Sequence, residues 1–318
     1  MAVKPETETK IPGGAFRPRV GRSRHFARRS QIGYAFEAPA IIVLAAITVF
    51  PLCYNIWLSF QHRVLTEPYA NHPVGLANYQ TLVADGQFWH DLLRTLMFTG
   101  ISVSVELALG MVLALVVSKK FRARALVRAS ILIPWAIPTA VSAMLWVMFF
   151  DSRTGFVDFF LGRLGLPGSH LVWFNSAFFA WIPIILSDMW KNTPFMALLL
   201  MAGLQAIPQE LYESARIDGA GSWQGFWRIT VPLMRPVILV ALIFRSLSAL
   251  LVFSTVFVMT GGGPGTATEV VAYYNWYQFF TSLNYGYGSA ISVVITIVAM
   301  ALALVYVRTM VHRGELLQ

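Results

Sequence analysis

The sequence predicts an all-α protein that crosses a membrane with six helices. Only 12% of its 318 residues are charged and 57% are hydrophobic, whereas about a quarter of the residues of a soluble domain are charged. Helices are expected rather than a barrel, because a lone helix satisfies its own backbone in lipid and no short alternating segments are visible. Each apolar segment is near the ~20 residues that span a hydrocarbon core; they run at about 34–59, 92–117, 129–150, 177–202, 233–258 and 288–307.

Residues 1–32 precede the membrane domain, which we place at 33–318. This stretch is polar, rich in proline and glycine, and carries eight basic residues, so we predict a mostly disordered tail. A signal peptide is not expected, because the basic region is too long and no clear cleavage site follows the apolar run.

The placement of the basic residues predicts the orientation. Loop 118–128 carries five lysines and arginines and the tail carries eight, whereas loop 259–287 carries none. An excess of basic residues marks the cytoplasmic side, so we expect both termini and loop 203–232 to be cytoplasmic. The formal net charge of +9 follows from this bias, and nucleic-acid binding is not predicted.

The third and fourth segments contain features that interrupt an apolar helix. Pro134 and Pro138 predict a kink or broken turn in the third, which either lines a cavity or only adjusts packing. In the fourth, Asp188 and Lys191 are three residues apart and are expected to pair on one helix face. They form either a structural ion pair or part of a substrate path.

Other polar groups lie in the same segments. Trp190 and Asn192 offer an aromatic face and an amide, the groups that a sugar needs. Glu106 and Arg245 lie deep in the second and fifth segments, where they either pair across helices or line a pathway.

Two loops on the predicted outer side have distinctive sequences. Residues 74–79 read Val-Gly-Leu-Ala-Asn-Tyr, and residues 259–264 read Met-Thr-Gly-Gly-Gly-Pro. The three glycines predict a tight, irregular turn, and a phosphate-binding loop is rejected because no GK[ST] follows. The aromatic run 273–280 predicts a belt at the membrane interface, and the small residues 286–290 predict close packing of the last helix.

A polar island at 205–232 separates the fourth and fifth segments. Pro208 suits a helix start, Gly219 accepts the left-handed conformation that ends a helix, and Ser222 is expected to cap a second helix. From periodicity alone, this helix-turn-helix is either a surface loop or a docking element.

The spacing in this island resembles the EAA signature of permease subunits of binding-protein-dependent ABC importers. Glu213, Ala215, Gly219, Ile229 and Pro232 match in register, and Ser214 replaces the middle alanine. The outer loops are similar to the GLxNY and TxGGP…T stretches of the carbohydrate branch of this family.

The resemblance implies a six-helix permease with a cytoplasmic coupling helix, in a bacterial-type inner membrane, that moves a sugar. A di- or oligosaccharide such as trehalose or maltose is expected rather than glycerol phosphate, because the predicted outer half of the membrane has no dense cluster of lysine and arginine to bind phosphate. It implies a second related permease, an ATPase dimer that binds ATP and Mg²⁺, and an extracytoplasmic sugar-binding protein; the chain itself is expected to hold no cofactor or metal. The coupling positions it implies are Glu213, Ser214, Ala215, Asp218 and Gly219.

Two further sets of site residues are predicted. The sugar path is assigned to Asp188, Trp190, Asn192 and Arg245, and the binding-protein contact to Thr260, Gly261, Gly262, Gly263 and Pro264. The chain lacks a Walker A motif, an HExxH motif and a GxSxG motif, so no enzyme activity is predicted. An ion-coupled secondary transporter that uses Glu106, Asp188 and Arg245 is the alternative, and a membrane scaffold without transport activity is a third reading.

Overall fold

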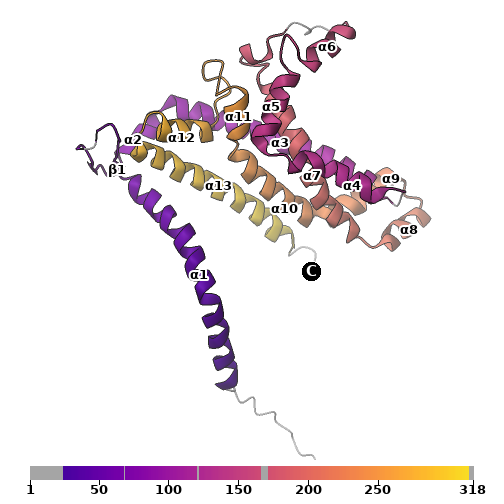
Figure 1. Ribbon diagram of the computed structural model, residues 1–318. Helices are drawn as coiled ribbons and strands as arrows, with labels where there is room; N and C mark the ends of the chain where they lie inside the picture. The colour runs from indigo at the N-terminus through magenta and orange to yellow at the C-terminus, as the bar shows by residue number, and fades with distance from the viewer. Residues whose placement is uncertain (1–23, 68, 120–121, 166–170, 315–318) are drawn as a thin grey trace, which may run out of the picture. The chain divides into compact units, whose positions relative to one another are not determined.

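The computed structural model describes residues 24–67, 69–119, 122–165 and 171–314 (Figure 1). Most of the predicted tail 1–32 lies outside these ranges. From Arg24 the chain is helical, and α1 spans Arg24–Leu58, so residues 24–32 of the predicted tail are part of this helix. The chain divides into two units, residues 1–54 and 55–318, which we describe separately.

Within the described ranges, the first unit consists of α1 as far as Tyr54. From Glu37 to Leu58 this helix is apolar and long enough to cross a membrane. Its side chains are largely exposed in the isolated chain, as those of Ile42, Ile47 and Phe50 show. Exposed apolar side chains over such a length indicate contact with lipid or with another protein.

The second unit is helical apart from a two-stranded antiparallel hairpin, β1 (Gln61–His62) and β2 (His72–Pro73), within the described ranges. After the hairpin the helices follow in the order α2 (Ala77–Ala84), α3 (Gly86–Ser118), α4 (Arg124–Ala136), α5 (Thr139–Phe149), α6 (Phe156–Arg163), the 3-10 turn η1 (Trp173–Asn175), α7 (Trp181–Gln205), α8 (Gln209–Ile217), α9 (Ser222–Gly225), the π-helical turn η2 (Phe226–Thr230), α10 (Val231–Leu250), α11 (Ser254–Met259), α12 (Val271–Phe280) and α13 (Tyr285–Gly314).

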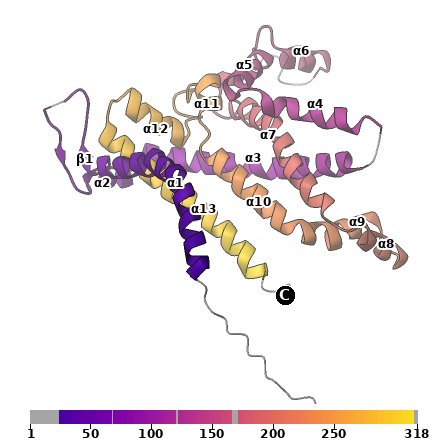
Figure 2. The same cartoon turned by 60° about the horizontal axis from the view of Figure 1, so that its bottom comes forward.

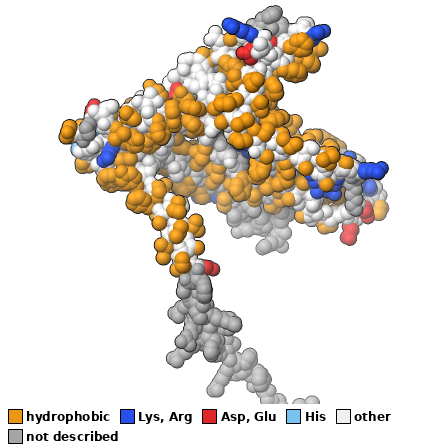
Figure 3. Space-filling view, viewed as in Figure 1, with side chains coloured by type: hydrophobic (Ala, Val, Ile, Leu, Met, Phe, Trp, Pro, Cys, Tyr) orange, Lys and Arg blue, Asp and Glu red, His pale blue; other side chains and the backbone are white. Residues whose placement is uncertain are grey.

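Four helices of the described chain are long and apolar enough to cross a membrane, or up to six if each of two bent pairs is one span. One bent pair is α4 and α5, which meet at 91°. Pro138 precedes α5 and Pro134 lies in α4, so the predicted break is confirmed. The all-α polytopic fold is confirmed as well. Figure 3 shows hydrophobic side chains over much of the surface of the second unit, with charged side chains gathered towards its ends.

The fifth predicted segment, 233–258, differs from the structure. α9, η2 and α10 together form a helical stretch from Ser222 to Leu250, so the span starts earlier. The chain then breaks at residues 251–253, and α11 follows as a separate short helix. Val256 of α11 is completely buried. The apolar pattern could not reveal this break, because the residues on both sides of it are mostly hydrophobic.

α3, α7 and α10 form the centre of the second unit (Figure 2). Their contact surfaces are lined by buried side chains, among them Phe98, Ile184, Leu200 and Met234. A side chain at Gly110 of α3 would meet Met196 at 2.8 Å. The glycine therefore permits the close approach of α3 and α7.

The GLxNY-like stretch has a structural role. The side-chain amide of Asn78 donates hydrogen bonds to the carbonyls of Ser59 and Gln61, at 2.8 and 2.9 Å. The Tyr79 hydroxyl lies 2.7 Å from that of Ser59. A side chain at Gly286 would approach the Gln61 carbonyl to 2.1 Å, which confirms the predicted close packing at the start of the last helix.

Candidate functional site

The predicted docking element is present as two short helices joined by a turn. α8 begins after Pro208 and ends at Ile217, and α9 begins at Ser222. The expected cap at Ser222 is wrong by one residue. Gly221 precedes the helix, and its backbone N–H donates to Gln224 Oε1 at 3.1 Å.

Gly219 ends α8 as predicted. Its φ is +82°, the left-handed region. The N–H of Ala220 donates to the Ala215 carbonyl at 2.8 Å, and the N–H of Gly219 donates to the Arg216 carbonyl at 3.0 Å. These two bonds form a Schellman motif, which satisfies carbonyls at the helix end and fixes the direction of the next residues.

α8 exposes most of its surface, although it connects two membrane-spanning helices along the chain. None of its residues is buried in the described chain. Ile217 is 87% exposed and Trp223 of α9 is 72% exposed. Tyr212 and Ala215 are half-buried, and the Tyr212 hydroxyl lies 2.8 Å from the Thr230 hydroxyl. α8 is therefore held to the start of α10 by one side while its other faces remain free.

The predicted coupling residues surround this turn. Ala215, Asp218 and Gly219 line an open groove together with Arg228 and Ile229. Glu213 and Ser214 are exposed on α8. An exposed carboxylate, exposed apolar side chains and an open groove are the features of a surface that accepts another protein.

A second polar site lies inside the helix bundle. Arg245 of α10 pairs with Glu106 of α3 through Nε and Nη2, the latter at 2.8 Å from Glu106 Oε1, and with Asp188 of α7 through Nη2. The exposed fractions are 4%, 0% and 7% for Arg245, Glu106 and Asp188. We call these three residues the ionic centre.

The ionic centre bears on two predictions from the sequence: how Glu106 and Arg245 interact, and which residue pairs with Asp188. Glu106 and Arg245 pair across helices. The expected pair of Asp188 with Lys191 is wrong: Lys191 Nζ instead donates to the Trp135 carbonyl at 3.3 Å. Asp188 turns inward because a buried guanidinium offers it hydrogen bonds as well as charge, whereas Lys191 lies towards the surface of α7.

The four predicted sugar-path residues do not share one surface. Asn192 donates to the carbonyl and the Oδ1 of Asp188, both at 2.9 Å, so it joins the ionic centre. Trp190 is 39% exposed and lies edge-on to Trp146 of α5, with ring centroids 6.2 Å apart. The structure therefore brings Asp188, Asn192 and Arg245 together and places Trp190 beside another aromatic.

Sequence reasoning missed a polar stripe on α3 that leads to the ionic centre. Its residues repeat every three or four positions and are buried; they are Asp91, Thr95, Thr99, Ser102 and Glu106. The hydroxyls of Thr99 and Ser102 have no hydrogen-bond partner in the described chain. The helical spacing of these polar residues within an apolar segment was the signal that could have revealed them.

The glycine-rich loop has the tight, irregular form that was predicted. Gly261 and Gly262 have φ of +57° and +84°. The hydroxyls of Thr260 and Thr268 lie 2.7 Å apart, and the Thr268 hydroxyl donates to the Gly263 carbonyl at 2.7 Å. Gly261 is exposed, whereas Gly262 is buried, so only part of Thr260–Pro264 is accessible to a partner.

Glu269 lies behind this loop, outside the membrane-spanning segments. Burial, and next the nearby Asp91 carboxylate, raise the pKa of Glu269 to about 7, against the opposing effect of Arg94. Gln87 donates to it at 3.4 Å, and Arg94 pairs with Asp91 at 2.7 Å. Within the described ranges no group of three histidine, cysteine, aspartate or glutamate side chains could hold a metal ion.

Comparison with known proteins gives consistent matches over most of the chain. Residues 106–314 match the family described as binding-protein-dependent transport system inner membrane component. The trehalose/maltose transport system permease protein MalF of Thermococcus litoralis is 40% identical over 82% of this chain and 88% of the relative. The trehalose transport system permease protein SugA of Mycobacterium tuberculosis is 35% identical over 84% of each chain.

A further relative and a solved structure extend the comparison. The sulfoquinovosyl glycerol transport system permease protein SmoG of Agrobacterium fabrum is 41% identical over 85% of this chain and 87% of the relative. The fold resembles a chain in the crystal structure of a bacterial alginate ABC transporter in complex with an alginate pentasaccharide-bound periplasmic protein. That match has a TM-score of 0.76 at 25% identity, over 90% of this chain and 96% of the other.

Proposed function

Because this chain belongs to the family of binding-protein-dependent transport system inner membrane components, we propose that it is the permease subunit of an ATP-driven importer that carries a sugar into the cytoplasm. Two relatives are named for the disaccharides trehalose and maltose, which supports a di- or oligosaccharide substrate. A third is named for sulfoquinovosyl glycerol, a single sugar unit joined to glycerol. The chain is not itself the ATPase, since it lacks the Walker A motif.

The observation that carries the coupling role is the exposed surface of α8 and the turn that follows. This surface, in the register of the EAA signature, fits a cleft in a cytoplasmic ATPase dimer. Glu213 supplies a charge, Ala215 permits a close contact, and Gly219 fixes the turn. Ser214 and Asp218 are the other two residues that we assign to the contact with the ATPase.

α8 is connected to the transport helices on both sides. It follows α7 after a bend of 70°, and the Tyr212–Thr230 contact joins it to η2 and α10. Asp188 on α7 and Arg245 on α10 are paired, so a displacement of α8 reaches two helices that are joined at the ionic centre. A packed contact of this kind has two alternative arrangements rather than a continuous deformation, which suits alternating access.

For the sugar path we propose Asn192 and Trp190 as two separate contacts, because they lie on different surfaces of α7. Asp188, itself paired with Arg245, holds the Asn192 amide in place. An aromatic face packs against the C–H groups of a sugar, and an amide pairs with its hydroxyls. Alanine at Asn192 or Trp190 is expected to raise the KM for uptake several-fold, while the amount of inserted protein stays unchanged. Wild-type kinetics for both variants would remove these residues from the path.

We propose that the assembly contains a second related permease, two ATPase copies that bind ATP and Mg²⁺, and an extracytoplasmic sugar-binding protein. The exposed part of the Thr260–Pro264 loop is assigned to contact with the binding protein. The transporter would lie in a bacterial-type cytoplasmic membrane with both termini inside.

The deciding experiment is uptake of labelled trehalose and maltose by cells that express the chain with its genomic neighbours. We expect uptake to require the co-expressed ATPase with an intact Walker A lysine, and to survive a protonophore while ATP is maintained. Uptake that needs only an ion gradient would support the ion-coupled alternative, for which the buried ionic centre is the candidate coupling site.

A further inference from the structure

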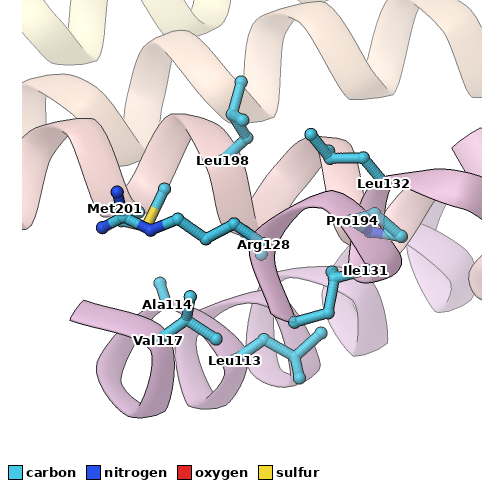
Figure 4. Close-up of a pocket in the computed structure, with 10 residues that line it drawn as sticks. Leu113, Ala114, Val117, Arg128, Ile131, Leu132, Pro194, Leu198 and Met201 are labelled. Carbon is cyan, nitrogen blue, oxygen red and sulfur yellow. The ribbon is translucent and has the colours of Figure 1, made fainter. Parts of the chain in front are cut away.

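Asp91 and Arg128 each have buried polar atoms without a hydrogen-bond partner in the described chain, but their surroundings differ. The Arg128 side chain runs across a space of about 30 Å³ whose lining is otherwise apolar (Figure 4). Such a space is large enough for a water molecule, which would satisfy these donors. Asp91 instead shares a hydrogen-bond donor with a second carboxyl group, that of Glu269.

The carboxyl groups of Asp91 and Glu269 lie at the contact between α3 and the end of the glycine-rich loop. Gln87 Nε2 donates to Asp91 Oδ1 at 2.9 Å and to Glu269 Oε2 at 3.4 Å, so one amide nitrogen contacts both groups. Asp91 is 0% exposed and Glu269 is 6% exposed. Neither carboxyl group can therefore rely on bulk water to solvate a charge.

The charges at this contact do not balance if both carboxyl groups are ionised. Arg94 Nη1 pairs with Asp91 Oδ1 at 2.7 Å, and within the described chain it is the cation that acts on Glu269. Tyr273 of α12 also interacts with Glu269 and supplies no positive charge. The Asp85 carboxylate, at the start of α3, accepts two tyrosine hydroxyls at 2.5 Å. One guanidinium thus faces two buried carboxyl groups, and an uncompensated buried charge is costly.

Asp91 Oδ2 shows where a proton is needed. Oδ1 of Asp91 accepts from Gln87 and Arg94, whereas Oδ2 is buried without a donor in the described chain. A protonated carboxyl group has an O–H donor, and one of two neighbouring carboxyl groups keeps its proton because like charges oppose the ionisation of both. Burial, and next the Asp91 carboxylate, raise the pKa of Glu269 to about 7 against the effect of Arg94, which agrees with Glu269 as the donor.

Glu269 also ends the glycine-rich loop. The preceding residue, Thr268, donates to the Gly263 carbonyl at 2.7 Å. Two residues later, the N–H of Val271 donates to Thr95 Oγ1 of α3 at 2.9 Å. Because Glu269 lies between these two contacts, a bond that holds Glu269 to α3 holds the loop as well.

We propose that Asp91 and Glu269 form a proton-binding site, in which protonated Glu269 donates to Asp91 Oδ2, directly or through a water molecule, and fastens the glycine-rich loop to α3. Loss of the proton leaves two buried negative charges side by side, which repel each other and loosen the loop. The site works in this way whichever sugar is carried.

Hydrogen–deuterium exchange of the full chain, purified with its partner subunits, tests the site. Exchange of residues 260–271 is measured from pH 5 to pH 9 and corrected for the intrinsic pH dependence of amide exchange. Since the closed loop holds the proton more tightly than the open loop, we expect wild-type protection to fall about tenfold between pH 6 and pH 8. Glu269→Gln has an uncharged donor at all pH values, so it should keep its protection at pH 8.

Asp91→Asn separates a shared proton from a contact that only packs. Without the second carboxylate, Arg94 can neutralise Glu269, so the fall in protection should move to lower pH by about one unit or more. Glu67→Gln is the matched control, because it makes the same substitution at an exposed position between β1 and β2, and it should behave as the wild type.

Two results would overturn the proton site. One is a wild-type loop whose protection does not change between pH 6 and pH 8, and the other is the same fall in protection in Glu269→Gln. The titration is repeated in sodium chloride and in potassium chloride at equal ionic strength. A fall whose pH depends on sodium would identify a sodium ion as the ligand in place of the proton.

Discussion

The ionic centre and the proposed coupling surface both contain charged residues, but their surroundings are opposite. The coupling surface comprises Glu213, Ser214, Ala215, Asp218 and Gly219 on α8 and the turn that follows it. In the ionic centre, Arg245 is buried and each of its carboxylate partners belongs to another helix. On α8, Glu213 is exposed and forms no ion pair within the described chain. A buried charge must be matched within the fold, whereas an exposed charge is available to a partner. We therefore expect the first site to govern the stability of the bundle, and the second to serve contact with a partner protein.

The largest effect is expected at the ionic centre. Arg245→Gln leaves Glu106 and Asp188 buried without a cation, and removal of one partner from a buried pair costs about 3–5 kcal/mol. We expect a much lower melting temperature in detergent and loss of uptake together. Arg235→Gln, on the same helix at an exposed position, is the control and should behave as the wild type. An unchanged melting temperature for Arg245→Gln would show that the ionic centre does not hold the three helices.

Glu269 shows what happens to a buried carboxyl group that lacks its own guanidinium. Because its pKa is raised from 4.5 to about 7, the folded state holds the proton more tightly than the unfolded state. The protonated form keeps full stability below pH 4.5, and this stability falls as pH rises to about 7, by up to about 3 kcal/mol at 1.36 kcal/mol per pKa unit. Glu269→Gln should remove this dependence when melting temperatures are compared between pH 5 and pH 8. A variant with the same pH slope as the wild type would assign the dependence to another group.

A substitution in the coupling surface should have the opposite effect: it should abolish transport and leave the fold intact. Gly219→Val places a β-branched side chain at φ +82°, which costs about 1–2 kcal/mol and misdirects the turn, although nothing lies within 4 Å of the new Cβ. We expect uptake to fall more than 10-fold with a nearly unchanged melting temperature. Gly221→Val is the control, since Gly221 also has open space and has φ of −74°. Normal uptake by Gly219→Val would contradict the role of the turn.

The two regions also differ in how far the sequence predicts them. The α8 turn depends on neighbouring residues, so Gly219 and the spacing around Glu213 were sufficient to place it. The ionic centre joins residues 57 and 139 positions apart, and local spacing favoured Lys191 as the partner of Asp188. Which face of a helix points inward depends on the packing of the other helices. The same limit hid the break after Leu250, because composition does not show which apolar residues contact protein and which contact lipid. The polar stripe on α3 is different, because its helical spacing is visible in the sequence.

The smallest effect is expected at the bond that connects α8 to α10. Tyr212→Phe removes the hydroxyl that lies 2.8 Å from that of Thr230 and keeps the ring, at a cost of about 0.5–1.5 kcal/mol for one hydrogen bond. The bundle does not depend on this bond, so the melting temperature should stay within a few degrees of the wild type. If α8 transmits motion through this contact, uptake should fall a few-fold while ATP hydrolysis by the assembled complex continues, so that less sugar moves per ATP.

Tyr79→Phe is the control. It removes a comparable hydroxyl contact, with Ser59, away from α8, and it should leave the ratio of sugar transported to ATP hydrolysed unchanged. An equal ratio in Tyr212→Phe and the wild type would place the transmission in α7 alone.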